Sequence, residues 1–228
     1  MALVPYVENS IPALSKLQNS SAQFRFANHD LRLAQDWKNL GVAAVVWDAA
    51  VVMCMYLELG KVELHGKLAI ELGAGTGLVG IAKCLALSSA TFLILPGAEV
   101  TITDREPALD FLSANVKANL PTDCQRSVVV SELTWGKGLE RYPPSRFDLV
   151  LGADIVYLED TFVPLLQTLE HLCSDTTVVL LACKIRYERD RNFLSMLKLR
   201  FKVEEVYYEK QRDIHVYKAC KLPRRRDL

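Results

Sequence analysis

From Lys67 onward, short apolar runs alternate along the chain with longer stretches that mix apolar and polar residues. Apolar runs of four to eight residues between polar or glycine-containing segments predict buried strands, and the longer mixed stretches predict helices. The predicted strands are Leu68–Leu72, Val100–Thr103, Ser127–Ser131, Leu149–Ala153, Val178–Cys183, Phe201–Tyr208 and His215–Ala219. The predicted helices are Gly77–Leu87, Glu106–Asn119, Thr161–Cys173 and Asp190–Leu199.

This alternation predicts an α/β fold with a doubly wound, mostly parallel sheet. Strands that are apolar on both faces and separated by helices form right-handed crossover units. The last two predicted strands are separated only by a short polar turn near Glu209–Asp213. Strands joined by so short a connection pair antiparallel. The sheet is therefore expected to end in a C-terminal antiparallel hairpin.

The first third of the chain predicts additional elements. Phe24–Phe26 and Leu31–Leu33 alternate apolar and polar residues on either side of Ala27–Asp30, which predicts a hairpin. A helix over Ala49–Leu59 is expected to be capped by Asp48 and to end at Gly60. No linker divides the chain. We expect residues 1–66 to form an N-terminal extension that packs on a core of residues 67–228, in a single structural unit.

Composition narrows the functional classes. The 228 residues hold 27 Lys and Arg against 27 Asp and Glu, so no net charge attracts the protein to nucleic acid or to an anionic membrane. Prolines and polar residues interrupt the N-terminus, so it does not read as a signal peptide. Two apolar runs, Val42–Leu57 and Leu78–Ala98, contain charged residues or proline and are interpreted as buried elements.

Cysteine usage suggests a reducing compartment and no metal. The six cysteines are scattered, without a Cys-x-x-Cys pair or a Cys/His cluster at the spacing of metal ligands. We therefore expect a cytoplasmic enzyme without a metal site. We also expect a monomer that binds neither nucleic acid nor membrane.

The segment Glu71–Gly77 carries the strongest chemical signal. A buried strand delivers Glu71 and is followed by glycines at 73, 75 and 77 before a helix. Gly73 and Gly75 allow a sharp turn and a close approach of the backbone to a ligand. Leu78 stands where a dinucleotide fingerprint requires glycine, and no Gly-Lys-Ser/Thr of a phosphate-binding loop is present. The pattern instead looks like the first motif of S-adenosylmethionine enzymes.

The chemistry of that ligand suits this segment. S-adenosylmethionine presents an ammonium, a carboxylate and a sulfonium. Glu71 suits the cationic end, and the backbone N–H groups after Gly75 suit the carboxylate. Asp104, at the end of the second predicted strand, is placed to accept hydrogen bonds from ribose hydroxyls. The distance from Gly73 to Asp104 is longer than usual because of an apparent insertion in Lys83–Glu99, which we expect to form a loop away from the pocket.

Two further segments are expected to complete the pocket. Trp135 follows the third predicted strand, and its indole can stack on an adenine ring. Ala153, Asp154 and Tyr157 follow the fourth strand. Ligands of open α/β sheets bind at the carboxyl ends of the strands. Asp154 and Tyr157 are therefore predicted to lie where cofactor and acceptor meet.

Four segments together resemble one family, the methyltransferase-like 21 family of protein-lysine methyltransferases, which has the seven-stranded, Rossmann-like class I methyltransferase fold. They are Trp47–Ala50, Glu71–Gly77, Leu133–Gly136 and the Asp-x-x-Tyr motif Asp154–Tyr157. The likeness covers nearly the whole chain. It departs at residues 83–99 and loosens across residues 7–23 and the C-terminal tail.

The resemblance implies cofactor contacts and a substrate. The family's contacts with S-adenosylmethionine carry over to Trp47, Gly73, Ala74, Gly75, Asp104, Trp135 and Ala153. Residues 1–6, 26–29, 166–173 and 185–190 look most like the branch that methylates heat-shock protein 70 chaperones. The resemblance thus implies a chaperone of that class as protein substrate, with Asp154 and Tyr157 at the catalytic end.

Two other functional classes remain open at this point. The first is a methyltransferase of the same fold that acts on nucleic acid, on a small molecule or on another protein. Amino-methylating nucleic-acid enzymes typically carry Pro-Pro after the first residue of the strand-four motif, where this chain has Ile155 and Val156. The second is a non-catalytic chaperone-binding module. The intact glycines, Asp104 and Asp154 argue against it.

Overall fold

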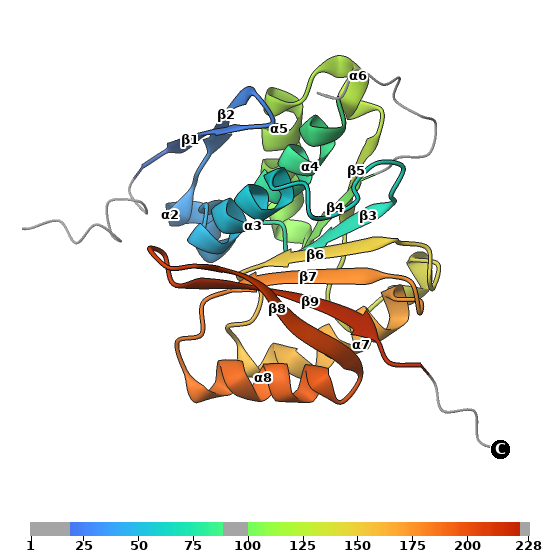
Figure 1. The fold of residues 1–228 in the computed structure, drawn as a ribbon. Helices are drawn as coiled ribbons and strands as arrows, with labels where there is room; N and C mark the ends of the chain where they lie inside the picture. Colours follow the sequence, from blue (N-terminus) through green and yellow to red (C-terminus); the bar gives the residue numbers. More distant parts are fainter. Residues whose placement is uncertain (1–18, 89–99, 224–228) are drawn as a thin grey trace, which may run out of the picture.

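The computed structural model describes residues 19–88 and 100–223. Its central sheet contains seven strands: β3 (Ala69–Leu72), β4 (Val100–Asp104), β5 (Val128–Glu132), β6 (Leu149–Ala153), β7 (Val178–Cys183), β8 (Phe201–Glu209) and β9 (Ile214–Lys221). Their order across the sheet is β5-β4-β3-β6-β7-β9-β8 (Figure 1). The first five pair in parallel, and β9 pairs antiparallel with both β7 and β8. The predicted sheet with its antiparallel C-terminal hairpin is confirmed.

Helices cover both faces of the sheet, and a hydrophobic core lies on each side (Figure 1). One face carries α3 (Asp48–Glu58), α4 (Leu78–Ser88), α5 (Leu109–Asn119) and the short α6 (Thr122–Gln125). The other carries α7 (Phe162–Leu172) and α8 (Glu188–Lys198). Because both faces are covered, the central strands β3 and β4 are buried along their whole length. This burial explains the continuous apolar runs of the sequence.

The strand order reverses between β3 and β6. From β3 the chain crosses to β4 and β5 on one side, then returns to β6 and β7 on the other. Crossover helices diverge at such a point and leave a crevice at the carboxyl ends of the two strands. The fold therefore places the residues after Leu72 and after Ala153 beside one another.

An N-terminal hairpin packs on α5. It consists of β1 (Ser21–Phe26) and β2 (His29–Ala34), joined at Ala27 and Asn28, which both have positive φ. The predicted hairpin is thus confirmed, with a two-residue turn. The side chain of Asn115 on α5 accepts a hydrogen bond from the Ala34 N–H at 2.8 Å and donates one to the Ala34 carbonyl at 3.2 Å. Through this buried amide, the hairpin is attached to the helix beside the glycine turn.

Helix starts differ from the prediction, most clearly at α3 and α5. Asp48 does not cap α3; it lies in the first turn, and Trp47 occupies the cap position without a side-chain cap bond. The helix expected from Glu106 begins with a 3₁₀ turn, η2 (Glu106–Ala108), before α5 starts at Leu109. Pro107 in this turn has no N–H to donate, which favours a tight irregular start. The insertion expected to form a loop lies outside the described residues beyond Ser88.

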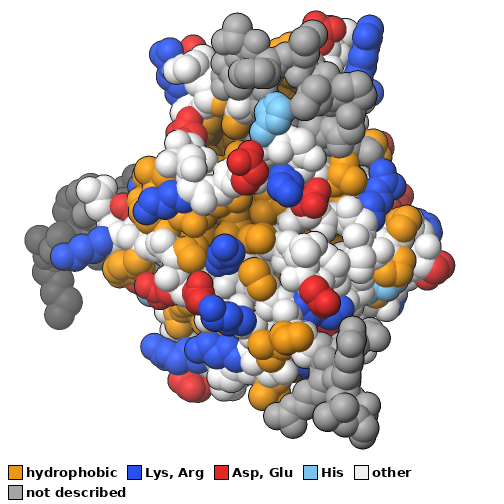
Figure 2. Space-filling model, turned by 45° about the vertical axis from the view of Figure 1, so that its right-hand side comes forward, with side chains coloured by type: hydrophobic (Ala, Val, Ile, Leu, Met, Phe, Trp, Pro, Cys, Tyr) orange, Lys and Arg blue, Asp and Glu red, His pale blue; other side chains and the backbone are white. Residues whose placement is uncertain are grey.

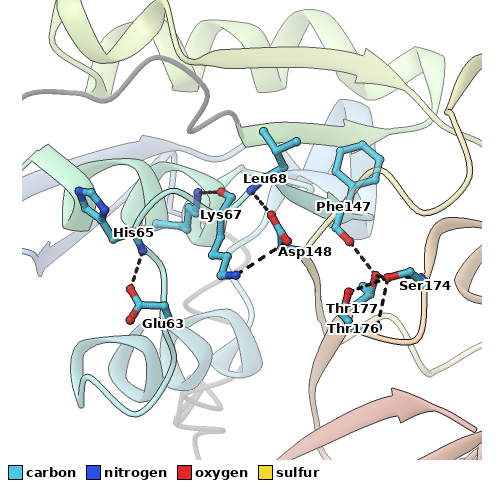
Figure 3. A network of polar contacts seen from close by, with 10 residues as sticks. Glu63, His65, Lys67, Leu68, Phe147, Asp148, Ser174, Thr176 and Thr177 are labelled. Atoms are coloured by element: carbon cyan, nitrogen blue, oxygen red, sulfur yellow. Dashed lines mark hydrogen bonds and ion pairs between the residues drawn. The ribbon is translucent and has the colours of Figure 1, made fainter.

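A polar network ties the amino ends of the strands together, at the edge opposite the crevice (Figure 3). Asp148, just before β6, accepts a hydrogen bond from the Leu68 N–H at 3.0 Å and lies 3.9 Å from the Lys67 ammonium. Thr177, just before β7, donates to the Phe147 carbonyl at 2.7 Å. These contacts fix the relative register of β3, β6 and β7 at one edge, so the same strands end in fixed positions at the other.

The surface agrees with the balanced composition. On the face drawn in Figure 2, acidic and basic side chains are interspersed around exposed hydrophobic ones. No single helix within the described residues is long and apolar enough to cross a membrane. One bent pair, Trp37–Ala44 with Asp48–Glu58, meets the criterion by length and composition, as the core helix of a soluble protein also can. The described residues contain no group of three or more His, Cys, Asp or Glu side chains that could hold a metal ion.

Candidate functional site

A cavity of about 490 Å³ opens at the carboxyl ends of β3, β4 and β6. All ten site residues predicted from the sequence line it: Trp47, Glu71, Gly73, Ala74, Gly75, Asp104, Trp135, Ala153, Asp154 and Tyr157. Pockets for small molecules and cofactors typically measure ~300–1,000 Å³. Residues spread over more than a hundred positions of the chain are thus brought to one site of the size of a cofactor pocket.

The turn after β3 depends on its glycines. Gly73 and Gly75 have φ values of +60° and +56°, a region that L-residues rarely adopt. A Cβ atom on Gly73 would lie 3.0 Å from Ile155 and 3.1 Å from the Trp135 ring. One on Gly75 would lie 2.8 Å from the Ala43 carbonyl oxygen. Gly75 therefore also makes room for the 3₁₀ turn η1 (Gly41–Ala44), which brings the N-terminal extension against the pocket.

The carboxylate of Asp104 organises this turn. It accepts a hydrogen bond from the Gly75 N–H at 2.7 Å and another from the Arg105 N–H at 2.7 Å. The Gly77 N–H donates to the Ala74 carbonyl at 2.9 Å. The backbone N–H groups after Gly75 were expected to be available for a ligand carboxylate. That of Gly77 is not, because it closes the turn itself.

Glu71 is buried beneath the turn, with 2 % of its surface exposed. Its carboxylate accepts a hydrogen bond from the Gly80 N–H at 2.8 Å and so satisfies a backbone donor in the first turn of α4. Burial raises the pKa of Glu71 to about 8, although this hydrogen bond opposes the rise. A cation at this end of the pocket would favour the ionised form. The cofactor-binding role of Glu71 stays a prediction, with a structural role now shown beside it.

Two tryptophans frame the cavity from different parts of the chain. The Trp47 indole donates to the Val42 carbonyl at 2.9 Å, which holds the ring against η1. The half-buried Trp135 ring lies against the Gly73 turn. It packs on the hydrophobic core between the sheet and α7. Both rings line the cavity. They offer flat surfaces suited to an aromatic base, which is the role predicted for Trp135.

Asp154 directly follows β6 and has an unusual backbone conformation. Its φ is +55°, and its N–H donates to the Ala182 carbonyl of β7 at 2.8 Å. Asp and Asn are the residues other than glycine that adopt this conformation most readily. The turn directs the chain away from the sheet, and the side chain is only 8 % exposed. Such strain in a residue that lines a cavity is characteristic of functional sites.

The Asp154 carboxylate has one cationic neighbour, Arg186, among the groups found to act on it in the described part of the chain. The Arg186 Nη1 lies 3.4 Å from Asp154 Oδ1. Burial raises the pKa of Asp154, and Arg186 partly opposes this rise. Tyr157 lies nearby on the same cavity wall. Burial also raises the pKa of its phenol, so it is a neutral hydrogen-bonding group at physiological pH.

Comparison with known proteins identifies the family. The family model described as "Lysine methyltransferase" matches residues 25–200. A protein N-lysine methyltransferase METTL21A from Danio rerio is 66% identical over 97% of this chain and 97% of its own length. The chain belongs to the METTL21 family of protein-lysine methyltransferases. It is an S-adenosylmethionine-dependent enzyme with a protein substrate.

More distant similarities agree with this assignment. An EEF1A lysine methyltransferase 3 from Mus musculus is 41% identical to this chain. The match covers 88% of this chain and 82% of the relative's own length. A solved structure of a putative S-adenosylmethionine-dependent methyltransferase from Streptococcus mutans superposes with a TM-score of 0.60. It is 10% identical and covers 89% of this chain and 56% of its own, and at that identity it supports the fold alone.

The pocket of this METTL21 chain fits S-adenosylmethionine. The turn at Gly73 and Gly75 has positive φ values and lines the cavity without side chains, so a ligand can lie close to its backbone. Glu71 and Asp104 would supply carboxylates for an ammonium and for ribose hydroxyls, and the tryptophans would supply flat apolar walls. Trp47, Glu71, Gly73, Ala74, Gly75, Asp104, Trp135 and Ala153 are the residues that would hold the cofactor.

Sequence reasoning missed several pocket residues. Val42 and Ala43 line the cavity from η1, and Arg105 and Arg186 line it from loops after β4 and β7. Val42 and Ala43 lie in an apolar stretch with no chemical signature. Arg186 lies in the segment 185–190, which entered the sequence analysis only through the family resemblance. The positive charges of the two arginines were the available signal, but many exposed arginines share it.

Proposed function

We propose that this enzyme methylates a lysine side chain of a folded heat-shock protein 70 chaperone, as a monomer in the cytoplasm. The resemblance to the chaperone-methylating branch supports the substrate. The scattered cysteines support a reducing compartment, and the five cysteines buried in the described residues are all free. The balanced net charge argues against a polyanionic acceptor.

The observation that carries the site assignment is the buried carboxylate of Asp154 at the edge of the cofactor-sized cavity. A lysine reaches the protein as an ammonium, because its ordinary pKa is ~10.4. A desolvated carboxylate is suited to capture this cation and to aim it. Tyr157 lies beside it, and its ring can form a wall of the lysine channel with a cation–π contribution.

The amine must then lose its proton before it can act as a nucleophile. When bound, S-adenosylmethionine supplies an electrophilic methyl group on a sulfonium. Burial in this apolar cavity disfavours the ammonium, as does any positive charge close by. Asp154 stabilises the ammonium and so does not by itself promote the deprotonation. We assign it the capture and orientation of the substrate, and most of the rate to positioning.

A substrate panel tests the proposal. The purified enzyme is incubated with labelled S-adenosylmethionine and, in separate reactions, with a purified heat-shock protein 70, with EEF1A and with whole-cell lysate. We expect label on the chaperone, on a lysine mapped by mass spectrometry. EEF1A is included because a relative at 41% identity bears its name. Labelling of EEF1A alone, of nucleic acid or of a small metabolite would contradict the proposed acceptor.

Cellular placement and assembly are tested separately. Fractionation of cells that express the full chain is expected to recover it with cytoplasmic markers. Light scattering is expected to give one chain per particle, close to 25.6 kDa. Recovery with membranes, or a mass of two chains, would contradict these two parts of the proposal and leave the substrate assignment standing.

A further inference from the structure

We infer that the Arg186 guanidinium takes, in the enzyme without its protein substrate, the place beside Asp154 that the ammonium of the acceptor lysine occupies during the reaction. The substrate lysine displaces it, so that one cation is exchanged for another. This inference rests on the proposed role of Asp154 and concerns how that residue is kept ready for substrate.

The contact between the two residues is asymmetric. Arg186 Nη1 lies 3.4 Å from Asp154 Oδ1, and both residues line the same cavity. The Asp154 side chain is 8 % exposed, whereas that of Arg186 is 38 % exposed. The carboxylate is therefore fixed inside the cavity, and the guanidinium reaches it from the solvent side. A cation that approaches from solvent can also leave toward solvent.

The backbone of Arg186 is held independently of its side chain. The N–H groups of Arg186 and Tyr187 both donate to Asp190 Oδ2, at 2.8 and 2.9 Å. The Asp190 side chain is 4 % exposed and lies in the first turn of α8. This double hydrogen bond fixes the loop between β7 and α8. Displacement of the guanidinium therefore requires a change of side-chain rotamers and no rearrangement of the loop.

The charges around Asp154 explain why a cation is needed there. Asp48 on α3 and Asp190 on α8 both disfavour its ionised form, and burial acts in the same direction. Cys183 on β7 and Tyr157 also face it, both with raised pKa and hence neutral. Arg186 opposes these effects. It keeps the carboxylate ionised until a substrate ammonium provides the same compensation.

The exchange should be easy. A partly exposed ion pair shifts an equilibrium by only about two- to five-fold. Arg186 is thus too weakly held to exclude a lysine delivered by a docked protein. A guanidinium stays charged at all accessible pH values, so Arg186 does not itself titrate.

Steady-state kinetics at pH 9 provides the first test, with Arg186→Gln, Arg186→Lys and Arg191→Gln compared with the parent. Arg191 is an exposed arginine at the start of the same helix, paired with Glu188, so its replacement removes an equal charge. We expect Arg186→Gln to lower KM for the protein substrate about two- to five-fold at unchanged kcat. Arg186→Lys and Arg191→Gln should match the parent. A KM for Arg186→Gln that is unchanged or higher overturns the inference.

A titration without substrate provides the second test. The carboxyl carbon of Asp154 is observed by NMR in aspartate-labelled protein and is assigned by its loss in Asp154→Asn. Removing this partly exposed cation should raise the titration midpoint of the carboxyl group by about 0.3–0.7 pH unit, which is the same two- to five-fold effect. We expect this rise in Arg186→Gln and not in Arg186→Lys or Arg191→Gln. A midpoint in Arg186→Gln equal to that of the parent overturns the inference.

Failure of the inference differs from failure of the proposed function. If Asp154→Asn loses methyl transfer while Arg186→Gln matches the parent in both tests, Asp154 keeps its role and the inference alone is wrong. If Asp154→Asn methylates the substrate as fast as the parent, both the role of Asp154 and the inference are wrong.

Discussion

The Gly75 N–H donates to the carboxylate of Asp104 at 2.7 Å, which joins the turn after β3 to the end of β4. Asp104 was predicted from the sequence as a ligand for ribose hydroxyls. The structure adds that the same carboxylate shapes the glycine turn. Cofactor affinity should therefore depend on Asp104 both through any direct contact and through the conformation of Gly75.

Replacing Asp104 with alanine should weaken S-adenosylmethionine binding about 10- to 100-fold. Hydrogen bonds to a charged group contribute ~1.5–3 kcal/mol each, and the substitution removes the acceptor of two backbone bonds. Isothermal titration calorimetry measures the change. Asp110→Ala removes an exposed carboxylate six residues further on and should bind like the parent. Equal affinities for both variants would contradict the role of Asp104.

The Gly75→Ala variant should lose cofactor affinity by at least ~10-fold. Alanine at a positive φ costs about 1–2 kcal/mol, and here its Cβ would also lie 2.8 Å from the Ala43 carbonyl oxygen. Gly66 offers a matched control, because its φ is +69° and a Cβ there meets no atom within 4 Å. Gly66→Ala should show the cost in stability without the loss of binding. If both variants bind S-adenosylmethionine like the parent, the glycine turn does not form the cofactor site.

Glu71 should make stability depend on pH. Its pKa is about 8 in the folded protein, against an ordinary 4.5, so the folded state holds the extra proton between these values. Its contribution is fully present below pH 4.5 and is lost as pH rises toward 8, by about 1.4 kcal/mol per pH unit in that window. Glu71→Gln keeps an acceptor for the Gly80 N–H and should flatten the curve. Urea unfolding at pH 5, 6.5 and 8 tests this, with Glu106→Gln, an exposed site, as control.

Lys83 should have the opposite effect at higher pH. Its side chain is fully buried, its amine donates to the Lys67 carbonyl at 3.0 Å, and burial lowers its pKa to about 8. The unfolded chain holds this proton up to pH 10.5, so stability rises with pH between 8 and 10.5. Relative to the parent, Lys83→Met should therefore lose about 3 kcal/mol of stability between pH 8 and pH 10.5, at about 1.4 kcal/mol per pH unit, so any gain from the substitution is greatest below pH 8. Lys117→Met, at an exposed position of α5, should show no such trend.

The sheet could be predicted from the sequence because burial dictates its residues. β6 and β7 were predicted to the residue, since apolar runs bounded by polar loops can form only buried strands there. Helix starts were less certain. α8 begins at Glu188, two residues before the predicted start, because the Asp190 side chain caps the preceding backbone. Such caps depend on side-chain geometry, which cannot be inferred from the periodicity of apolar residues along the sequence.

The candidate site was predictable wherever a strand end carried its own chemistry. Glu71, Asp104 and Asp154 lie within the last two residues of a strand or directly after it, and the topology brings such ends together. The contact of Arg186 with Asp154 could not be predicted, because 32 positions separate the residues and no spacing rule joins two loops. The close approach of Ala43 to Gly75 is likewise a matter of tertiary packing. The relative positions of loops that follow different strands cannot be read from the sequence.

Replacing Asp154 with asparagine should abolish most turnover and spare cofactor binding. Asparagine tolerates the positive φ of this position almost as well as aspartate, so the substitution removes the charge with little change of backbone. The proposed partner of the carboxylate is the substrate ammonium, so affinity for S-adenosylmethionine should stay within a few-fold of the parent. Turnover on the protein substrate should fall at least ~10²-fold if aiming this cation is the role of Asp154.

The pH profile distinguishes loss of this charge from general damage to the site. Burial raises the pKa of Asp154, so activity of the parent should fall as pH decreases through that raised value and the carboxylate is protonated. The residual activity of Asp154→Asn should lack this acid limb, because no titrating group remains at the position. Asp160→Asn, at an exposed carboxylate six residues later, should keep both the rate and the limb. An acid limb that persists unchanged in Asp154→Asn would assign it to another group, and equal rates in the two variants would remove Asp154 from the acceptor site.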